Sequence, residues 1–150
     1  MTGHEAAVEI VGSPPTPTAV IRAVSTWPEF PRLWRQLLDE VYRARAAGAF
    51  EQRGDNVMVY LDDRPSVEIG VQAAASFDPY GSVVASTLPT GPAAHLLHRG
   101  AYARLGESHA ALLDWCRARG RSTTGVRWEI YGDWRENEAE LETDIFWQLG

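Results

Sequence analysis

Carboxylate and aromatic side chains alternate with apolar ones in two short segments near the C-terminus. The segments are Trp128-Glu129-Ile130-Tyr131 and Thr143-Asp144-Ile145-Phe146. If both are β-strands, alternate residues point to the same side of the sheet. An acidic face with large aromatic surface suits a flat hydrophobic ligand, neutral or cationic, through stacking and cation–π attraction. The side chains predicted to share that face are Glu129, Tyr131, Asp144 and Phe146.

The same reasoning adds ligand-binding candidates from other parts of the chain. The first half contributes Met58, Tyr60 and Glu68, and two loop tryptophans, Trp27 and Trp134, lie beside the ends of the expected groove. An alternative interpretation is that these carboxylates only form the solvated side of an antiparallel sheet. Aromatic residues on the same side weaken that interpretation, because they would form an exposed apolar patch unless a ligand fills it.

The residue spacing does not favour other kinds of active site. Ser108 and His109 lie within a predicted helix without a Gly-x-Ser-x-Gly turn, and His109 falls on its apolar face, so we interpret it as a core residue. His95 and His98 are three positions apart on a predicted strand and point to opposite faces, which disfavours joint metal ligation. Cys116 continues an apolar stripe. We therefore expect neither a metal nor a cofactor.

Two segments have the periodicity of amphipathic helices. Apolar residues from Phe30 to Tyr42 recur at offsets of 3, 4, 7 and 8, which predicts a helix over about 28–47. A second set, from Tyr102 to Cys116, predicts a helix near 101–119 that ends before Gly120.

The order strand, helix, strand, strand occurs twice along the chain. The glycines that end the two helices, Gly48 and Gly120, are 72 positions apart, and Tyr60 and Tyr131 in the strands that follow are 71 apart. Such a nearly constant offset indicates an internal duplication, with pseudo-repeats at approximately 8–75 and 82–149. The predicted strands lie at 8–11, 19–24, 57–61, 67–71, 82–86, 93–98, 128–131 and 141–147.

The fold class expected is α+β, in one domain spanning 1–150. Neither half has a second helix, so we expect one antiparallel sheet with both helices on one face and the ligand groove on the other. In that arrangement Glu129 points away from the helices. The residues expected to pack beneath the helices include Val59, Ile130, Ile145 and Trp147.

Composition excludes several classes of protein. The chain has 150 residues, 45% of them hydrophobic, and its net charge of −6 disfavours direct binding of nucleic acid. No apolar run approaches the roughly 18 residues of a membrane span, and the single cysteine excludes an internal disulfide framework. Residues 1–5 lack the features of a secretory signal, so we expect a cytoplasmic location. Residues 1–18 are too few for a helix-turn-helix, and a homodimer is left open.

Five segments together resemble the GyrI-like small-molecule-binding family, which includes effector-binding domains of multidrug-responsive bacterial regulators. The resemblance implies the same duplicated fold, with a ligand between the two halves, against aromatic residues and a glutamate at Glu129. It also implies a second acidic residue at Asp144, one methylene shorter than the family's glutamate, and an aromatic at Phe146. By the same resemblance, Tyr102 is expected to close the turn that begins at His98 and to reach the groove. The segments are Leu88–Tyr102, Leu105–Glu107, Leu112–Trp115, Trp128–Tyr131 and Thr143–Ile145.

The resemblance leaves three functions open. The first is a stand-alone protein that binds a planar, hydrophobic or cationic drug-like molecule for sequestration, sensing or detoxification. The second is a hydrolase that opens the cyclopropane ring of DNA-alkylating natural products, as some stand-alone members do, with Glu129 as general base and Tyr131 as proton donor. The third is a modulator of a partner protein, of the gyrase-inhibitor type.

Overall fold

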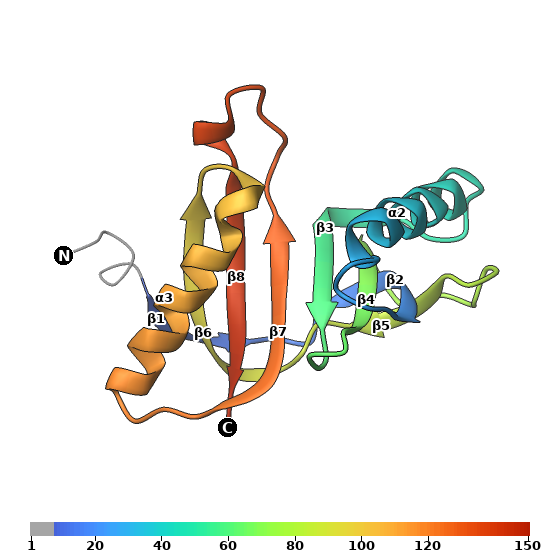
Figure 1. Ribbon diagram of the computed structural model, residues 1–150. Coiled ribbons are helices and arrows are strands. Elements are labelled where there is room, and N and C mark those ends of the chain that lie inside the picture. The colour runs from blue at the N-terminus through green and yellow to red at the C-terminus, as the bar shows by residue number, and fades with distance from the viewer. Residues whose placement is uncertain (1–7) are drawn as a thin grey trace.

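Eight strands form one antiparallel sheet, and two α-helices pack against one of its faces (Figure 1). The computed structural model describes residues 8–150. Residues 1–5, on which the expected cytoplasmic location rests, lie outside the described residues. The elements are β1 (Glu9–Ser13), β2 (Pro17–Val24), α2 (Phe30–Ala46), β3 (Gln52–Tyr60), β4 (Ser66–Ala73), β5 (Val84–Thr87), β6 (Gly91–Arg99), the 3₁₀ turn η1 (Tyr102–Arg104), α3 (Leu105–Ala118), β7 (Thr123–Tyr131), the 3₁₀ turn η2 (Glu138–Glu140) and β8 (Glu142–Leu149).

The strand order is β1-β6-β8-β7-β3-β4-β2-β5, and all neighbouring strands are antiparallel. The two halves of the chain meet at the β3–β7 pair, where Met58 lies opposite Glu129. The two edge strands are exchanged, because β1 of the first half pairs with β6 and β5 pairs with β2. The predicted α+β class and the single antiparallel sheet are confirmed. The internal duplication, with pseudo-repeats at approximately 8–75 and 82–149, stays a prediction.

Two short connections carry the exchanged strands across the back of the sheet. Residues 14–16 join β1 to β2, and residues 88–90 join β5 to β6. The connections touch each other, since the backbone N–H of Leu88 donates to the carbonyl of Thr16 at 2.9 Å. Leu88 is buried in the apolar cluster behind β3 and β7, so this contact lies on the face of the sheet that carries no helix.

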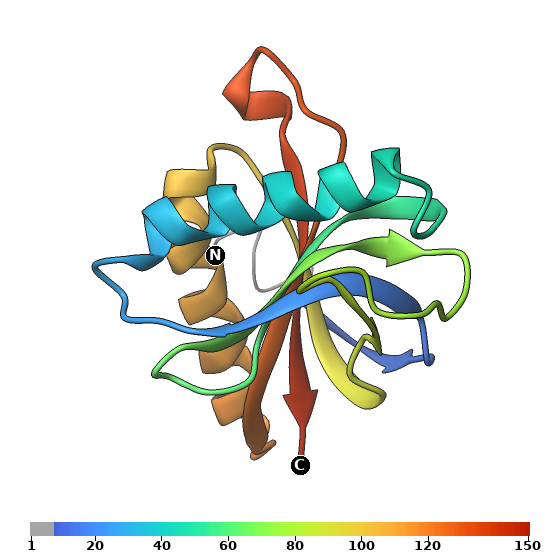
Figure 2. The same cartoon turned by 90° about the vertical axis from the view of Figure 1, so that its right-hand side faces the viewer.

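Each helix covers the outer strands of one half of the sheet (Figures 1 and 2). Val41 of α2 packs in one core cluster with Val71 of β4, and Leu112 of α3 packs in another with Ile145 of β8. The helices predicted over 28–47 and 101–119 are thus observed as α2 and α3, both on the same face. β3 and β7 lie between them. Within residues 8–150, no helix is long and apolar enough to cross a membrane.

The side-chain directions predicted for the two central strands are wrong. Val59 and Ile130, expected beneath the helices, face away from them and belong to one cluster with Trp128, which is 1% exposed. This cluster also contains Val20 of β2 and Ala93 of β6. The sheet therefore curls until its outer strands meet behind β3 and β7, and both faces of these two strands are buried. Alternation of polar and apolar residues cannot identify the helix face of such a strand.

Candidate functional site

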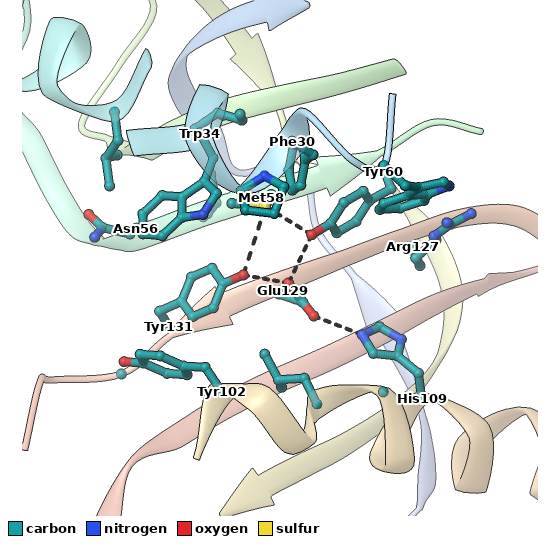
Figure 3. Close-up of a pocket in the computed structure, with 18 of the residues that line it drawn as sticks. Phe30, Trp34, Asn56, Met58, Tyr60, Tyr102, His109, Arg127, Glu129 and Tyr131 are labelled. Atoms are coloured by element: carbon teal, nitrogen blue, oxygen red, sulfur yellow. Dashed lines mark hydrogen bonds and ion pairs between the residues drawn. The ribbon is translucent and has the colours of Figure 1, made fainter. Parts of the chain in front are cut away.

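A cavity of about 780 Å³ opens between α2 and α3, with β3 and β7 as its floor (Figure 3). It lies on the helix face of the sheet, so the predicted location of the groove on the opposite face is wrong. Glu129 accordingly points toward the helices. Residues of seven elements (α2, β3, β4, η1, α3, β7 and β8) and two loops line the cavity, among them Trp27, Phe30, Trp34, Asn56, Met58, Tyr60, Tyr102, Leu105, His109, Arg127, Glu129, Tyr131, Trp134 and Trp147.

The walls of the cavity are mainly aromatic. Phe30 and Trp34 project from α2 on one side, and Tyr102 and His109 project from the α3 side, as Figure 3 shows. Both helices are amphipathic, and the residues at their facing edges reach past the core into the space over β3 and β7. This lining provides the flat apolar surface that stacks on an aromatic ligand.

Three large aromatic side chains stand at the rim in contact with solvent. Trp27 is 46% exposed, Tyr102 is 40% exposed and Trp134 is 72% exposed. Trp27 is fixed by a hydrogen bond from its indole N–H to the carbonyl of Asp63 at 3.0 Å. Tyr102 meets the ring of Tyr131 edge-on at 5.7 Å between centroids. The rim therefore offers apolar area to any molecule that enters.

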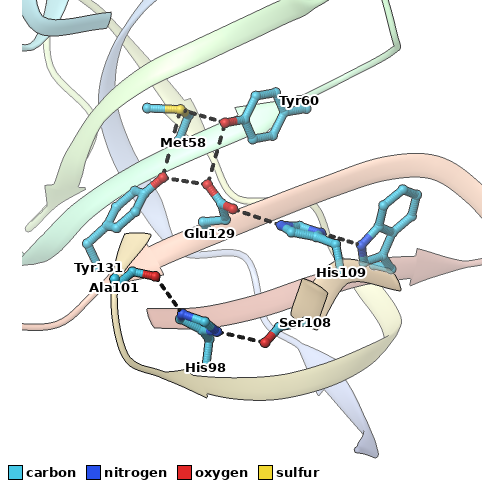
Figure 4. Close-up of polar contacts among 9 residues, drawn as sticks. Met58, Tyr60, His98, Ala101, Ser108, His109, Glu129 and Tyr131 are labelled. Carbon is cyan, nitrogen blue, oxygen red and sulfur yellow. Dashed lines mark hydrogen bonds and ion pairs between the residues drawn. The ribbon is translucent and has the colours of Figure 1, made fainter. Parts of the chain in front are cut away.

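Glu129 is the acidic group of the cavity floor and is only 4% exposed. Its carboxylate accepts hydrogen bonds from the hydroxyl of Tyr131, from the hydroxyl of Tyr60 at 3.5 Å and from Nε2 of His109 at 2.8 Å (Figure 4). Among residues 8–150, no arginine forms an ion pair with it. Burial of a carboxylate is costly unless it is hydrogen-bonded. Glu129 is stabilised by these donors, without a permanent cation as partner.

The two tyrosines are held in their protonated, donating form. Burial, and next the negative charge of Glu129, raise the pKa of both Tyr60 and Tyr131 well above the ordinary value of a tyrosine. Both hydroxyls therefore remain hydrogen-bond donors to Glu129 at neutral pH.

His109 links the cavity floor to the neighbouring strand. Its Nε2 lies 2.8 Å from Glu129, and its Nδ1 accepts a hydrogen bond from the indole N–H of Trp147 at 2.9 Å. His109, predicted from the sequence as a core residue, instead lines the cavity. The only signal was its position four residues after Leu105, which puts both on one side of α3.

Arg127 is the positively charged residue of the lining. Its guanidinium lies over the rings of Tyr60 and Trp147, 5.3 and 5.2 Å from their centroids, and pairs with Asp63 at 2.7 Å. Its charge is thus directed to the β3–β4 loop and to aromatic faces. This residue was also missed, because Tyr60 becomes its neighbour only through the pairing of β3 with β7.

Three predicted ligand-binding residues do not line the cavity. Glu68 accepts hydrogen bonds from Arg22 at 2.9 Å and Ser86 at 2.8 Å on the other face of the sheet. Asp144 and Phe146 also face away from the helices. Asp144 bonds His95 Nε2 at 2.7 Å. Phe146 does not reach the cavity, because the register of β7 and β8 places it opposite Trp128. The two rings stack in parallel with their centroids 5.1 Å apart. The other seven, Trp27, Met58, Tyr60, Tyr102, Glu129, Tyr131 and Trp134, all line it.

Comparison with solved structures finds the same fold in several proteins. The structure of the EcmrR C-terminal domain matches with a TM-score of 0.78 at 17% identity, covering 95% of this chain and 96% of that one. In the EcmrR–DNA complex the TM-score is 0.79 at 18% identity, and the chain spans only 56% of the EcmrR chain. Among curated proteins, none matches.

Two further matches carry informative descriptions. The structure of SAV2435 bound to tetraphenylphosphonium has a TM-score of 0.67 at 9% identity, covering 95% of this chain and 93% of that one. A structure described as a hydrolase from Listeria innocua has a TM-score of 0.62 at 12% identity, covering 95% and 91%. At sequence level, the profile of the GyrI-like small-molecule-binding domain matches residues 6–149. The chain therefore belongs to the GyrI-like small-molecule-binding domain family.

Proposed function

We propose that this protein binds a bulky aromatic cation in the cavity between α2 and α3. The observation that carries the proposal is the buried carboxylate of Glu129, which lies on an aromatic cavity floor and has no permanent cationic partner among residues 8–150. An aromatic cation would stack on the walls and place its charge near this carboxylate and over the faces of the surrounding rings. The tetraphenylphosphonium complex of SAV2435 supports this class of ligand.

The cavity volume agrees with this ligand class. Sites for drug-sized molecules commonly measure about 300–1,000 Å³ and combine apolar walls with a few polar groups. The cavity, at about 780 Å³, has three polar or charged side chains at one place on its floor, namely those of Glu129, Tyr60 and Tyr131. We infer that the walls tolerate many planar shapes and that the carboxylate selects for positive charge.

The test compares the binding of a cation and a neutral analogue by isothermal titration calorimetry. We expect Glu129→Gln to weaken tetraphenylphosphonium binding by about 1–3 kcal/mol and to leave triphenylphosphine oxide nearly unaffected. Asp144→Asn is the matched control, since it removes one negative charge from the opposite face of the sheet. Equal losses for both variants, or no loss for Glu129→Gln, would show that Glu129 does not recognise the cation.

Hydrolysis of a strained electrophile is the second candidate. It is favoured by the fixed orientation of Glu129, whose two carboxylate oxygens are held by Tyr131 on one side and His109 on the other. As general base, Glu129 would take a proton from water as the hydroxyl attacks a cyclopropane carbon. The ring bond then breaks toward a conjugated carbonyl, which Tyr131 would protonate. The description of the Listeria structure as a hydrolase supports this reaction class.

Binding stands first because the raised pKa of Tyr131 makes it a weak proton donor to a substrate. The two functions separate by mass spectrometry of a cyclopropane alkylator after incubation with the protein. A gain of one water, with turnover roughly 10²–10⁴ lower in Glu129→Gln, would identify a hydrolase. Unchanged mass with retained binding would identify a binder.

A further inference from the structure

A chain of hydrogen bonds runs along the lining of the cavity through three elements. The indole N–H of Trp147 on β8 donates to Nδ1 of His109 on α3 at 2.9 Å. Nε2 of His109 lies 2.8 Å from Glu129 on β7. Because Nδ1 is the acceptor from an indole that can only donate, the proton of the neutral imidazole is on Nε2 and is donated to Glu129.

From this geometry we infer that Trp147 keeps His109 neutral, so that the charge of Glu129 remains available to a cationic ligand. The inference rests on the proposed function and assigns a positioning role to Trp147. A doubly protonated His109 would direct its Nδ1–H at the indole N–H of Trp147, and two donors would meet at 2.9 Å. That form loses one buried hydrogen bond and leaves two polar groups unsatisfied.

The charged groups around His109 have opposite effects on the protonation of its imidazole. Glu129, in contact at Nε2, favours the protonated imidazole. Arg127 opposes it, because its guanidinium lies over the same indole, 5.2 Å from the ring centroid, and adds a positive charge next to Trp147. Tyr60 and Tyr131 reach His109 only through Glu129 and stay protonated. Among the cavity-lining residues, the charged groups near His109 are Glu129 and Arg127.

The protonation of His109 would determine what the cavity selects. A protonated His109 would form a closed ion pair with Glu129, and an incoming cation would meet a neutralised floor. A neutral His109 donates a hydrogen bond without cancelling the carboxylate charge. Trp147 also lines the cavity, but its role in charge selection is indirect, because it acts through the hydrogen bond to His109.

The first test measures His109 directly, without a ligand. Nitrogen-15 NMR of the wild-type protein at pH 6 should show His109 as the neutral Nε2–H tautomer, with the signal identified by its absence in His109→Gln. In Trp147→Phe the same signal should change to the imidazolium form at a higher pH than in the wild type. A wild-type imidazolium at pH 6 would overturn the inference, whatever the protein binds.

The second test is the affinity for tetraphenylphosphonium at pH 5.5 and pH 8.0. Trp147→Phe should bind tetraphenylphosphonium about tenfold more weakly at pH 5.5 than at pH 8.0, because the positive charge of protonated His109 would then offset the charge of Glu129. The wild type should show a ratio within about twofold. Adding His109→Gln to Trp147→Phe should restore the wild-type ratio, because glutamine still donates to Glu129 but takes up no proton.

The control is Trp115→Phe, which removes an indole from the same helix that carries His109, where Trp115 packs against Arg119. It should keep the wild-type ratio. A flat pH profile in Trp147→Phe, or a pH dependence that persists in the double variant, would refute the role of Trp147. Absence of tetraphenylphosphonium binding by the wild type at pH 8.0 would instead contradict the proposed function, and the NMR result would still decide the state of His109.

Discussion

Replacing Phe146 by alanine separates the site predicted from the sequence from the site in the structure. If Phe146 lined the ligand groove, as expected from strand alternation, the substitution would weaken binding and leave the fold nearly intact. In the structure its ring stacks on Trp128 at 5.1 Å, lies 4.8 Å from the ring of His95 and packs against the buried cluster behind β3 and β7. We therefore expect a loss of stability with no loss of affinity.

The magnitude follows from the degree of burial. Truncation of a fully buried phenylalanine costs about 3–5 kcal/mol. Phe146 is only partly buried, which lowers this figure, and its stack on Trp128 contributes about 0.5–1.5 kcal/mol of the total. We expect Phe146→Ala to lower the free energy of unfolding by about 2–4 kcal/mol and Tm by roughly 5–15 °C.

The assay combines thermal unfolding with tetraphenylphosphonium binding at a temperature where the variant is folded. Phe146→Ala should bind within about twofold of the wild type, since the cavity lies on the other face of the sheet. Phe30→Ala is the matched comparison, because Phe30 lines the cavity, and it should weaken binding. Loss of affinity in Phe146→Ala with an unchanged Tm would refute the assignment of faces on β7 and β8.

Three further predictions concern stability. Burial and the charge of Glu129 raise the pKa of Tyr131, so its stabilising contribution is present below about pH 10 and is lost at higher pH. In urea unfolding, the free energy of unfolding should fall less between pH 9 and pH 11 in Tyr131→Phe than in the wild type. The hydrogen bond with Asp144 raises the pKa of His95, so the stability gained from that pair is present below about pH 6.5 and is lost as the pH rises; the Tm difference between wild type and Asp144→Asn should be larger at pH 6 than at pH 8. A Cβ on Gly70 would lie 1.8 Å from a backbone oxygen of β2, so Gly70→Ala should cost about 3 kcal/mol or more by denaturant unfolding, whereas Gly12→Ala, with nothing within 4 Å, should not.

The helices and the order of helix and strands along each half of the chain followed from local patterns. The apolar residues from Phe30 to Tyr42 form one stripe because only one side of α2 is buried, and the same holds for α3. On β8 the predicted faces are correct, since Ile145 packs under α3 and Trp147 contacts His109. The two helices each have one side that faces a core, and periodicity reports that side.

The site could be predicted only in part, because its contacts are long-range. Glu129 was singled out, but its partner His109 is 20 residues away and on a helix, and Trp147 is 38 residues from His109. The face of β7 was assigned wrongly because Trp128 and Glu129 are both buried, one behind the sheet and one in the cavity. Only the pairing of β7 with β3 and β8 distinguishes the two sides.

The exchanged edge strands constrain how a ligand can enter. The two halves are joined in front by the β3–β7 ladder and behind by the crossing connections at 14–16 and 88–90, which are bonded to each other. A hinge motion that moved α2 away from α3 would have to distort the β3–β7 ladder and both connections at the same time. We therefore expect a ligand to enter past the exposed rim side chains Trp27, Tyr102 and Trp134, and the association rate to depend on their rotamers.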